Sequence, residues 1–473
     1  MKAIKYVLVA GAMLVTTSSA FAQEADYKTM LAPIAKELKA NSGNALAAKD
    51  AVKEYTKTFK KNPEALVRLG EAFLMAKDYD AANQYADLAI GRNKNFGDAY
   101  ILKGDIAAMQ DNGGEAATWY QQAMTMDPKN PQGYMRYANV NRKVAPEETE
   151  KTLNLLKQNC PNFPVEAEAA HTYYTGGQYA KALNEYNQAK IDNLEEWRVS
   201  EYATTAYLAN DKAKALEVSQ YGINKWPKDM GFQRIAMWSK VDTEKFQDAL
   251  TNANVILNDT CKKTNRDYTY YGLALKGAGQ YDQAIEAYKK AQQVEPNDIK
   301  SLQYISEAYQ AKGDEDKALE YSQQYMDKNE NATPSDYAKL AAIYEAKAKK
   351  GIDKENNVAK ANAIYETMAS KYPSIAGWVY NTAGNGAADA GLDDMSAQFY
   401  QKTIDLLGNK ENRDADETGY LKQAYQLIGY YYWVTKNDLE AAKPYYQKLI
   451  VIDPNDKNAN AALNPAPAEG ENK

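Results

Sequence analysis

The sequence predicts an all-α fold, an α-solenoid of stacked helix pairs, and three observations lead to this prediction. Apolar and aromatic residues recur with the 3.6-residue period of a helix. Glycine-containing turns and prolines separate these helical segments. The same pair of segments then recurs along most of the 473-residue chain. Self-similarity at a fixed period is the sequence signature of a repeat architecture, so the repeat decides the fold.

The clearest unit covers residues 267–298. Aromatic and apolar residues lie on one face of a predicted helix over Tyr268–Lys276, and the same holds for a second helix over Tyr281–Val294. Gly279 lies between the two helices, where a chain reversal needs a permissive backbone. Pro296 ends the second helix. The unit is therefore predicted to be a helix–turn–helix pair.

This unit resembles the tetratricopeptide repeat, a helix–turn–helix element of about 34 residues. The family pattern has an aromatic residue, Leu-Gly and Tyr on the first helix, then Ala, an aromatic residue and Pro on the second. Landmarks of the pattern recur along the chain at Leu69-Gly70, Lys103-Gly104, Tyr120, Tyr173, Tyr186, Ala203, Ala215, Tyr309, Ala318, Tyr337, Tyr365, Gly429 and Tyr446. The resemblance implies about twelve helix pairs over residues 23–457, forming a superhelix. Segments 132–160, 232–257 and 378–407 keep helical periodicity but lose several landmarks.

Packing explains the residue types at these landmarks. Small residues such as Gly104 and Gly272 let two helices approach closely, because helix spacing depends on the side chains at the contact. Tyrosines such as Tyr288 are expected to fill the wedge between one repeat and the next. No single pair can bury its apolar face alone, so neighbouring pairs must stack. This role accounts for most of the 38 tyrosines, which stand beside only 8 phenylalanines.

Two stretches depart from the repeat period. Residues 349–357 insert about eight mostly polar residues between the helices of one pair, judged against the repeat period of about 34. Residues 408–419 form a longer polar and acidic stretch between two pairs. Both are expected to be exposed loops, which a repeat tolerates at small entropic cost.

The N-terminus has the three parts of a secretory signal peptide. Lys2 and Lys5 precede an apolar run over Tyr6–Val15, and a small-x-small cleavage site follows at residues 20–22. The alternatives are a buried first helix or a membrane anchor, but the apolar run is shorter than the roughly 20 residues that span a bilayer. We therefore expect residues 1–22 to be removed after Ala22. The mature chain would then be periplasmic or secreted, without a lipid-attachment cysteine.

The C-terminal stretch differs in composition from the repeats. Residues 458–473 are rich in Asn, Ala, Pro and Glu. Such a composition buries too little apolar surface to offset the entropy of ordering, so this tail is expected to be disordered.

Composition excludes several kinds of function. The net charge of −6 argues against binding to nucleic acid or to anionic lipid, both of which need a basic face. A single histidine excludes zinc sites that need two or more. Cys160 and Cys261 lie about three repeats apart, and stacked helices are about 8–10 Å from one another. A disulfide needs Cα atoms within about 7 Å, so no bridge between them is expected.

The sequence carries no recognisable catalytic motif. His171 has no serine or cysteine partner in a known arrangement. Gly113-Gly114 and Gly176-Gly177 are turn residues, because no strand precedes them and no Lys-Ser or Lys-Thr follows. We therefore predict a protein that is not an enzyme and that needs no cofactor and no metal.

The resemblance implies that the first helices of the pairs line a concave groove. Ten residues at its inward positions are candidate partner-binding residues: Arg142, Lys143, His171, Tyr174, Tyr207, Arg234, Trp238, Lys276, Tyr430 and Trp433. Aromatic and arginine side chains dominate binding hot spots. For Tyr207 and Trp238, the alternative is that they fill space between repeats. The Lys/Asn set with which some family members hold a C-terminal carboxylate is not visible.

These observations predict a non-catalytic periplasmic scaffold that binds a protein or peptide partner in its concave groove. The alternative is a glycan-binding protein, or an accessory protein of outer-membrane assembly or uptake, because aromatic platforms suit sugar faces. The missing lipid-attachment cysteine counts against this alternative.

Overall fold

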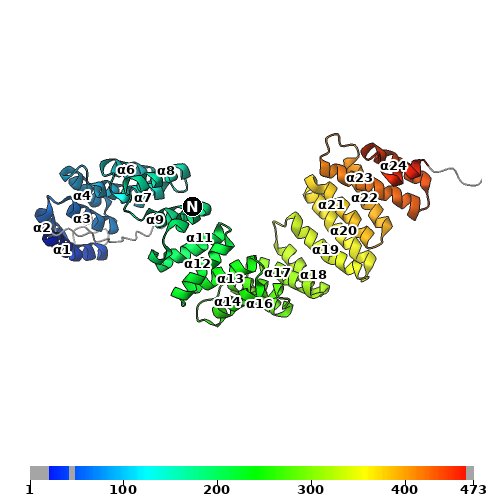
Figure 1. Cartoon of the computed structure of the whole chain (residues 1–473), viewed down its shortest axis with the longest axis horizontal. Helices are drawn as coiled ribbons and strands as arrows, with labels where there is room; N and C mark the ends of the chain where they lie inside the picture. The colour runs from blue at the N-terminus through cyan, green and yellow to red at the C-terminus, as the bar shows by residue number, and fades with distance from the viewer. Residues whose placement is uncertain (1–20, 42–47, 465–473) are drawn as a thin grey trace, which may run out of the picture. The chain divides into compact units, whose positions relative to one another are not determined.

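The computed structural model describes residues 21–41 and 48–464, and every regular element within them is a helix. The chain divides into two compact units, Met1–Ile235 and Ala236–Lys473, and each is described by itself. Figure 1 follows the helices in chain order, from α1 in blue to α24 in red. No helix in the described ranges is both long and apolar enough to cross a bilayer.

The helices of the N-terminal unit are α1 (Phe21–Ala40), α2 (Lys49–Phe59), α3 (Pro63–Met75), α4 (Tyr79–Arg92), α5 (Gly97–Met109), α6 (Gly113–Met126), α7 (Pro131–Asn141), α8 (Pro146–Asn159), α9 (Val165–Thr175), α10 (Tyr179–Gln188), α11 (Glu196–Leu208) and α12 (Lys212–Lys225). The boundary between the units falls inside α13 (Met230–Asp242). The helices of the C-terminal unit that follow are α14 (Phe246–Asn258), α15 (Asn265–Gly277), α16 (Tyr281–Val294), α17 (Lys300–Lys312), α18 (Glu315–Lys328), α19 (Pro334–Lys349), α20 (Lys354–Lys371), α21 (Ala376–Asp389), α22 (Asp393–Leu407), α23 (Ala415–Tyr430), α24 (Leu439–Ile452) and α25 (Lys457–Leu463).

Helices α1 to α24 form twelve consecutive pairs, in which odd-numbered helices come first. This number confirms the prediction. The three divergent segments are helix pairs as well: they contain α7 and α8, α13 and α14, and α21 and α22.

Helix starts follow local rules that the sequence already displays. Asn62 precedes the proline at the start of α3, and its side-chain oxygen accepts a hydrogen bond from the Glu64 N–H at 3.0 Å. Asn130 caps α7, which also begins with a proline. A short polar side chain satisfies an N–H that has no partner inside the helix, and proline at the first position has no N–H to satisfy.

The turn inside several pairs passes through the left-handed backbone region just before the second helix. Gly177 and Gly279 have φ angles of +79° and +76°, and Lys77 and Asn210 occupy the same kind of turn at +64° and +65°. Only glycine adopts this conformation without a Cβ penalty, so the predicted glycine-containing turns have a steric cause.

In two pairs the glycine of the first helix packs directly against a tyrosine ring of the second helix. A Cβ atom added to Gly104 would lie 2.3 Å from the Tyr120 ring, and one added to Gly272 would lie 2.4 Å from the Tyr288 ring. No real Cβ tolerates such a distance, so the ring takes the place that a side chain would need. The sequence separation between glycine and tyrosine is the same in both pairs.

In two pairs the residue after the glycine accepts a hydrogen bond from the tyrosine hydroxyl. Tyr120 donates to Asp105 at 2.7 Å, and Tyr400 donates to Asn385 at 2.6 Å. In the pair of α15 and α16, Leu273 takes the acceptor's place. The buried hydroxyl of Tyr288 accordingly has no hydrogen-bond partner among the described residues.

The two predicted loops are shorter than expected. α19 continues to Lys349 and α20 begins at Lys354, so most of residues 349–357 are helical. Asn357 is buried, and its side-chain amide donates to the Ile352 carbonyl at 2.7 Å. Likewise, α23 takes up residues 415–419 of the second stretch. In the second stretch, Asp414 and Glu417 form a capping box that starts α23 inside the segment expected to be a loop.

The prediction of disorder from residue 458 is wrong for residues 458–463, which belong to α25. Asp456 caps this helix by accepting from the Ala459 N–H at 2.8 Å, and Ala459 and Ala462 are buried in the core of the last repeat. Residues 465–473 lie outside the described ranges, as does the predicted signal peptide except for Phe21 and Ala22.

The last pair has a longer connection between glycine and tyrosine than its counterparts. Tyr446 stands one position further from Gly429 along the chain than Tyr288 stands from Gly272. The chain accommodates the additional residue in a π-helical turn at Tyr431–Thr435. Such turns are often found at functional sites.

Candidate functional site

The first helices of the pairs carry all ten candidate residues or lead directly into them. Arg142 and Lys143 follow α7 in the N-terminal unit. The guanidinium of Arg142 is buried and donates to the Asn139 carbonyl, so it secures the end of its own helix. Lys143 is exposed.

His171 on α9 is the centre of a small polar and aromatic cluster. Its Nδ1 lies 2.8 Å from the Glu201 carboxylate on α11, and the Tyr186 hydroxyl donates to the same carboxylate at 2.6 Å. The Trp197 ring meets the imidazole edge-on at 5.5 Å between ring centres. The histidine side chain is about one-third exposed and Trp197 is 47% exposed, so the cluster is reachable from solvent.

Two further candidates of this unit have different surroundings. Tyr174 is partly buried beside Tyr179, and burial followed by the negative charge of Glu201 raises the pKa of its phenol. Tyr207 is only 8% exposed, and the Lys212 ammonium lies 3.5 Å from its ring centre. A partner would reach the Tyr207 ring only if Lys212 moved.

Arg234 and Trp238 lie on α13, and each is partly buried. In the C-terminal unit, the Arg266 guanidinium stacks 3.6 Å from the ring centre of Trp238, and the Tyr270 ring is 5.7 Å away. Such a cation–π contact holds the tryptophan in place and presents a cationic surface beside it.

Lys276 belongs to a row of charged residues across three successive first helices. Its ammonium on α15 lies 2.9 Å from the Glu307 carboxylate on α17, which also binds Lys339 of α19 at 2.8 Å. Burial opposes the ionisation of Glu307, but the hydrogen bonds from the two lysines outweigh it and lower its pKa. The lowered pKa keeps the Glu307 carboxylate ionised at neutral pH.

Tyr430 and Trp433 lie at the π-helical turn of the last pair. Tyr430 is 49% exposed, whereas Trp433 is partly buried and meets the Tyr446 ring edge-on at 6.0 Å. Val434 beside them is exposed as well. This end of the C-terminal unit therefore shows apolar surface to solvent.

Carboxylates gather on α3 and α5 of the N-terminal unit. Arg68 binds Glu71 at 2.7 Å and Asp98 at 3.4 Å, and Arg136 binds Asp105 at 3.1 Å. Burial raises the pKa of Asp105 although Arg136 and Tyr120 favour its charged form. These residues were not among the candidates predicted from the sequence.

The C-terminal unit contains a cavity of about 250 Å³ that was not predicted from the sequence. Residues of α17, α18 and α19 line it: Gln303, Ser306, Glu307, Gln310, Ser322, Tyr325, Asp336, Lys339 and Ile343. Its place among the repeats was visible in the sequence, since serines occupy both the small-residue position and the tyrosine position of this pair.

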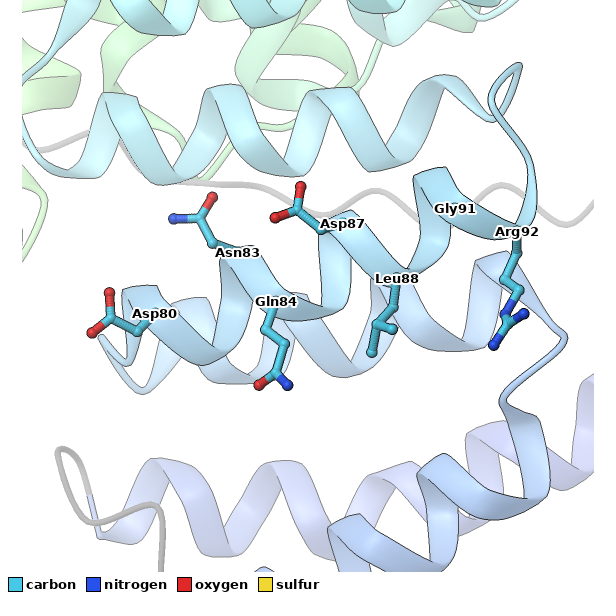
Figure 2. Close-up of a pocket in the computed structure, with 7 residues that line it drawn as sticks. All are labelled: Asp80, Asn83, Gln84, Asp87, Leu88, Gly91 and Arg92. Atoms are coloured by element: carbon cyan, nitrogen blue, oxygen red, sulfur yellow. The ribbon is translucent and has the colours of Figure 1, made fainter.

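A second hollow, of about 630 Å³, lies along α4. Figure 2 shows that all of its lining side chains come from this one helix, and Asp87 among them is bound to Lys103 at 2.5 Å. A surface of one helix gives a ligand no opposing wall. Within the described ranges, no group of three or more His, Cys, Asp or Glu residues is arranged to hold a metal ion.

Models of the tetratricopeptide repeat match both units. The matches cover residues 35–97 and 81–131 near the N-terminus, and residues 268–298 and 422–456 in the C-terminal unit.

Curated relatives are similar to part of the chain. Photosystem I assembly protein Ycf3 of Prochlorococcus marinus (strain MIT 9303) is 34% identical over 92 residues, which are 18% of this chain and 53% of the relative. The same protein of Rippkaea orientalis is 32% identical over 113 residues, 23% of this chain and 64% of the relative. The chain thus spans little more than half the length of the first and under two thirds of the second.

Solved structures with helical repeats are also similar. The C-terminal part of a TPR repeat-containing protein from Cytophaga hutchinsonii is 20% identical, with 56% of this chain and 99% of that chain covered and a TM-score of 0.46. MamA from Desulfovibrio magneticus RS-1 is 18% identical, with 36% and 96% covered and a TM-score of 0.33. The helix pairs, the contacts between small residues and tyrosines, and the repeat matches in both units lead to one conclusion: the chain contains tetratricopeptide repeats in both of its units.

Proposed function

We propose that this protein is a non-catalytic scaffold that binds a protein or peptide partner along the inner faces of its first helices. The row of Lys276, Glu307 and Lys339 supports the proposal most directly. Each residue comes from a different repeat, and all three are partly exposed on one face. An extended row of this kind suits an extended polypeptide, which can contact one repeat after another.

The family supports the same proposal, since tetratricopeptide-repeat proteins are typically scaffolds without catalytic activity. The curated relatives are named as assembly proteins of photosystem I. For this chain we infer the more general role, in which the repeats hold a protein partner.

We also propose that the protein acts in the periplasm or is secreted after cleavage behind Ala22. The support is the sequence of residues 1–22, with its basic start, apolar run and small-residue site. Cell fractionation and N-terminal sequencing test the proposal: the mature chain should begin at Gln23. An intact N-terminus on cytoplasmic protein would contradict it.

A capture experiment with variants that replace charged lysines by neutral glutamines tests the binding proposal. Tagged full-length protein is used to capture partners from cell-envelope extract, and the double variant Lys276→Gln/Lys339→Gln is compared with wild type. The matched control, Lys289→Gln/Lys402→Gln, changes two lysines on second helices. We expect a partner that wild type and control retain and the inner-row variant loses. Equal capture by all three proteins would reject the inner faces as the binding surface.

Glycan binding is the second candidate, and the half-exposed Trp197 beside His171 favours it. An indole face can stack on a sugar ring while Glu201 and His171 offer hydrogen bonds. Binding of the full-length protein and of Trp197→Ala to a panel of polysaccharides decides this candidate. Binding that Trp197→Ala loses would support it, and a panel without any bound glycan would exclude it.

A further inference from the structure

The pair of α17 and α18 lacks the tyrosine wedge of its neighbours. In the pair of α15 and α16, Gly272 packs against Tyr288, and in the pair of α21 and α22, Gly384 packs against Tyr400. The sequence separation between glycine and tyrosine is the same in both pairs. At the corresponding positions the pair of α17 and α18 has Ser306 and Ser322. Both serines are buried, at 5% and 7% exposed, so neither is simply a surface substitution.

The missing ring leaves the cavity of about 250 Å³ between α17, α18 and α19. Ser306, Ser322 and the buried Ile343 form its inner wall, and the exposed Gln310 and Lys339 lie where it meets solvent. A cavity of about 150 Å³ is large enough to bind benzene. The volume here therefore admits an aromatic ring with a substituent.

The cavity also keeps the acceptor that a tyrosine hydroxyl uses elsewhere in the chain. Glu307 follows the small residue Ser306, just as Asp105 follows Gly104 and accepts a hydrogen bond from Tyr120. The ion pairs of Glu307 with Lys276 and Lys339 leave its carboxylate able to accept a further hydrogen bond from a tyrosine hydroxyl. Asp105 binds Arg136 and the Tyr120 hydroxyl through one and the same oxygen.

We propose that this cavity binds a tyrosine side chain of the protein partner, an inference that rests on the proposed scaffold function. The partner's ring occupies the place of the missing wedge, between Ser306 and Ser322, and its hydroxyl donates to Glu307. Lys276 and Lys339, on either side of Glu307, belong to the inner row that contacts the rest of the partner.

Binding of two defined peptides to the full-length protein tests the proposal. The probe is acetyl-Gly-Gly-Tyr-Gly-Gly-amide, and the control probe has phenylalanine in place of tyrosine. A small ligand of this kind is expected to bind with a dissociation constant on the order of 1 mM. The phenylalanine peptide should bind about tenfold more weakly because it lacks the hydrogen bond to a charged acceptor. Absence of binding by the tyrosine peptide at ten times that concentration would overturn the proposal.

Two variants locate the binding. Ser322→Tyr restores the wedge, so it should abolish peptide binding and raise the melting temperature, whereas the control Ser370→Tyr on the exposed face of α20 should leave binding unchanged. Glu307→Leu copies the natural Leu273 and should remove the preference for tyrosine over phenylalanine. If Ser322→Tyr does not fold, the Glu307→Leu comparison decides, and an unchanged preference contradicts the proposal.

The partner capture experiment separates this inference from the proposed function. If the inner-row variant loses the partner and a folded Ser322→Tyr variant retains it, the scaffold function stands and the tyrosine site is rejected. If neither variant loses any partner, the scaffold proposal itself fails.

Discussion

At the residue scale, single positions decide whether a buried hydroxyl is satisfied. Tyr288 and Tyr400 occupy equivalent places on second helices, and each packs against a glycine. Tyr400 donates to Asn385, whereas Leu273 gives Tyr288 no acceptor. A buried polar group without a partner loses its hydration and gains nothing in return. The two tyrosines should therefore respond oppositely to loss of the hydroxyl.

Replacement of these tyrosines by phenylalanine tests that expectation. Tyr288→Phe should leave the free energy of unfolding unchanged or raise it by up to about 1 kcal/mol, because it removes an unsatisfied group. Tyr400→Phe should lower it by about 1 kcal/mol, because a formed hydrogen bond is lost. Urea denaturation of both variants measures the difference. Equal effects would contradict the role assigned to Leu273.

Asp105 provides a second residue-scale prediction, on pH dependence. Its pKa in the folded chain is raised above the ordinary value of 3.8 by burial, which exceeds the effects of Arg136 and Tyr120. A carboxyl group with a raised folded-state pKa contributes stability below its unfolded pKa and loses that contribution as pH rises through the folded pKa. Relative to Asp105→Asn, wild type should therefore become less stable as pH rises from about 3.8, until the group is fully ionised. Denaturation of both proteins at several pH values tests this prediction. If the stability of wild type relative to Asp105→Asn rose with pH, the attraction of Arg136 would outweigh the effect of burial on the pKa of Asp105.

At the element scale, the helix–turn–helix pair was predictable because its determinants are local. Glycine-containing turns, proline stops and helical periodicity predicted about twelve pairs, given the repeat period of about 34. Helices α1 to α24 of the described ranges form twelve. The lengths of irregular stretches were less predictable. Residues 349–357 read as a polar insertion, but Asn357 finds a backbone partner and the flanking helices extend. Whether such a polar stretch becomes helical depends on its burial against a neighbouring helix, and the periodicity of the sequence does not indicate that burial.

The turns give the element-scale prediction. Gly279 has a φ of +76°, and a Cβ atom there would meet nothing within 4 Å, so Gly279→Ala changes only backbone strain. The free energy of unfolding should fall by about 1–2 kcal/mol. Gly91 lies inside α4 and also has open space around a Cβ. Gly91→Ala should therefore raise stability by about 0.5–1 kcal/mol. Thermal denaturation of both variants tests whether conformation alone accounts for the turn glycine.

At the scale of the whole molecule, the sequence predicted the repeat architecture but only part of the candidate site. His171 and Lys276 are candidates because the resemblance to the repeat family implies which positions face inward, and the structure places each beside a carboxylate. Their carboxylate partners Glu201 and Glu307 lie 30 and 31 residues further along, close to one repeat period. That spacing could have revealed them. The cavity was missed because a missing side chain leaves no positive signal in the sequence, and its detection requires comparison of equivalent positions across repeats.

A perturbation at the C-terminal end of the solenoid should spread only to the neighbouring repeats. Removal of residues 457–473 deletes α25 and uncovers the core of the last repeat, where Ala459 and Ala462 pack beside Leu449. Each repeat contacts only its neighbours, so stability is close to a sum of local terms. Amide hydrogen exchange should therefore accelerate in α23 and α24 and stay unchanged in α3 to α6. A chain that lacks only residues 465–473 keeps α25 and serves as the control. Faster exchange in α3 to α6 would show long-range cooperativity that a row of nearest-neighbour contacts does not provide.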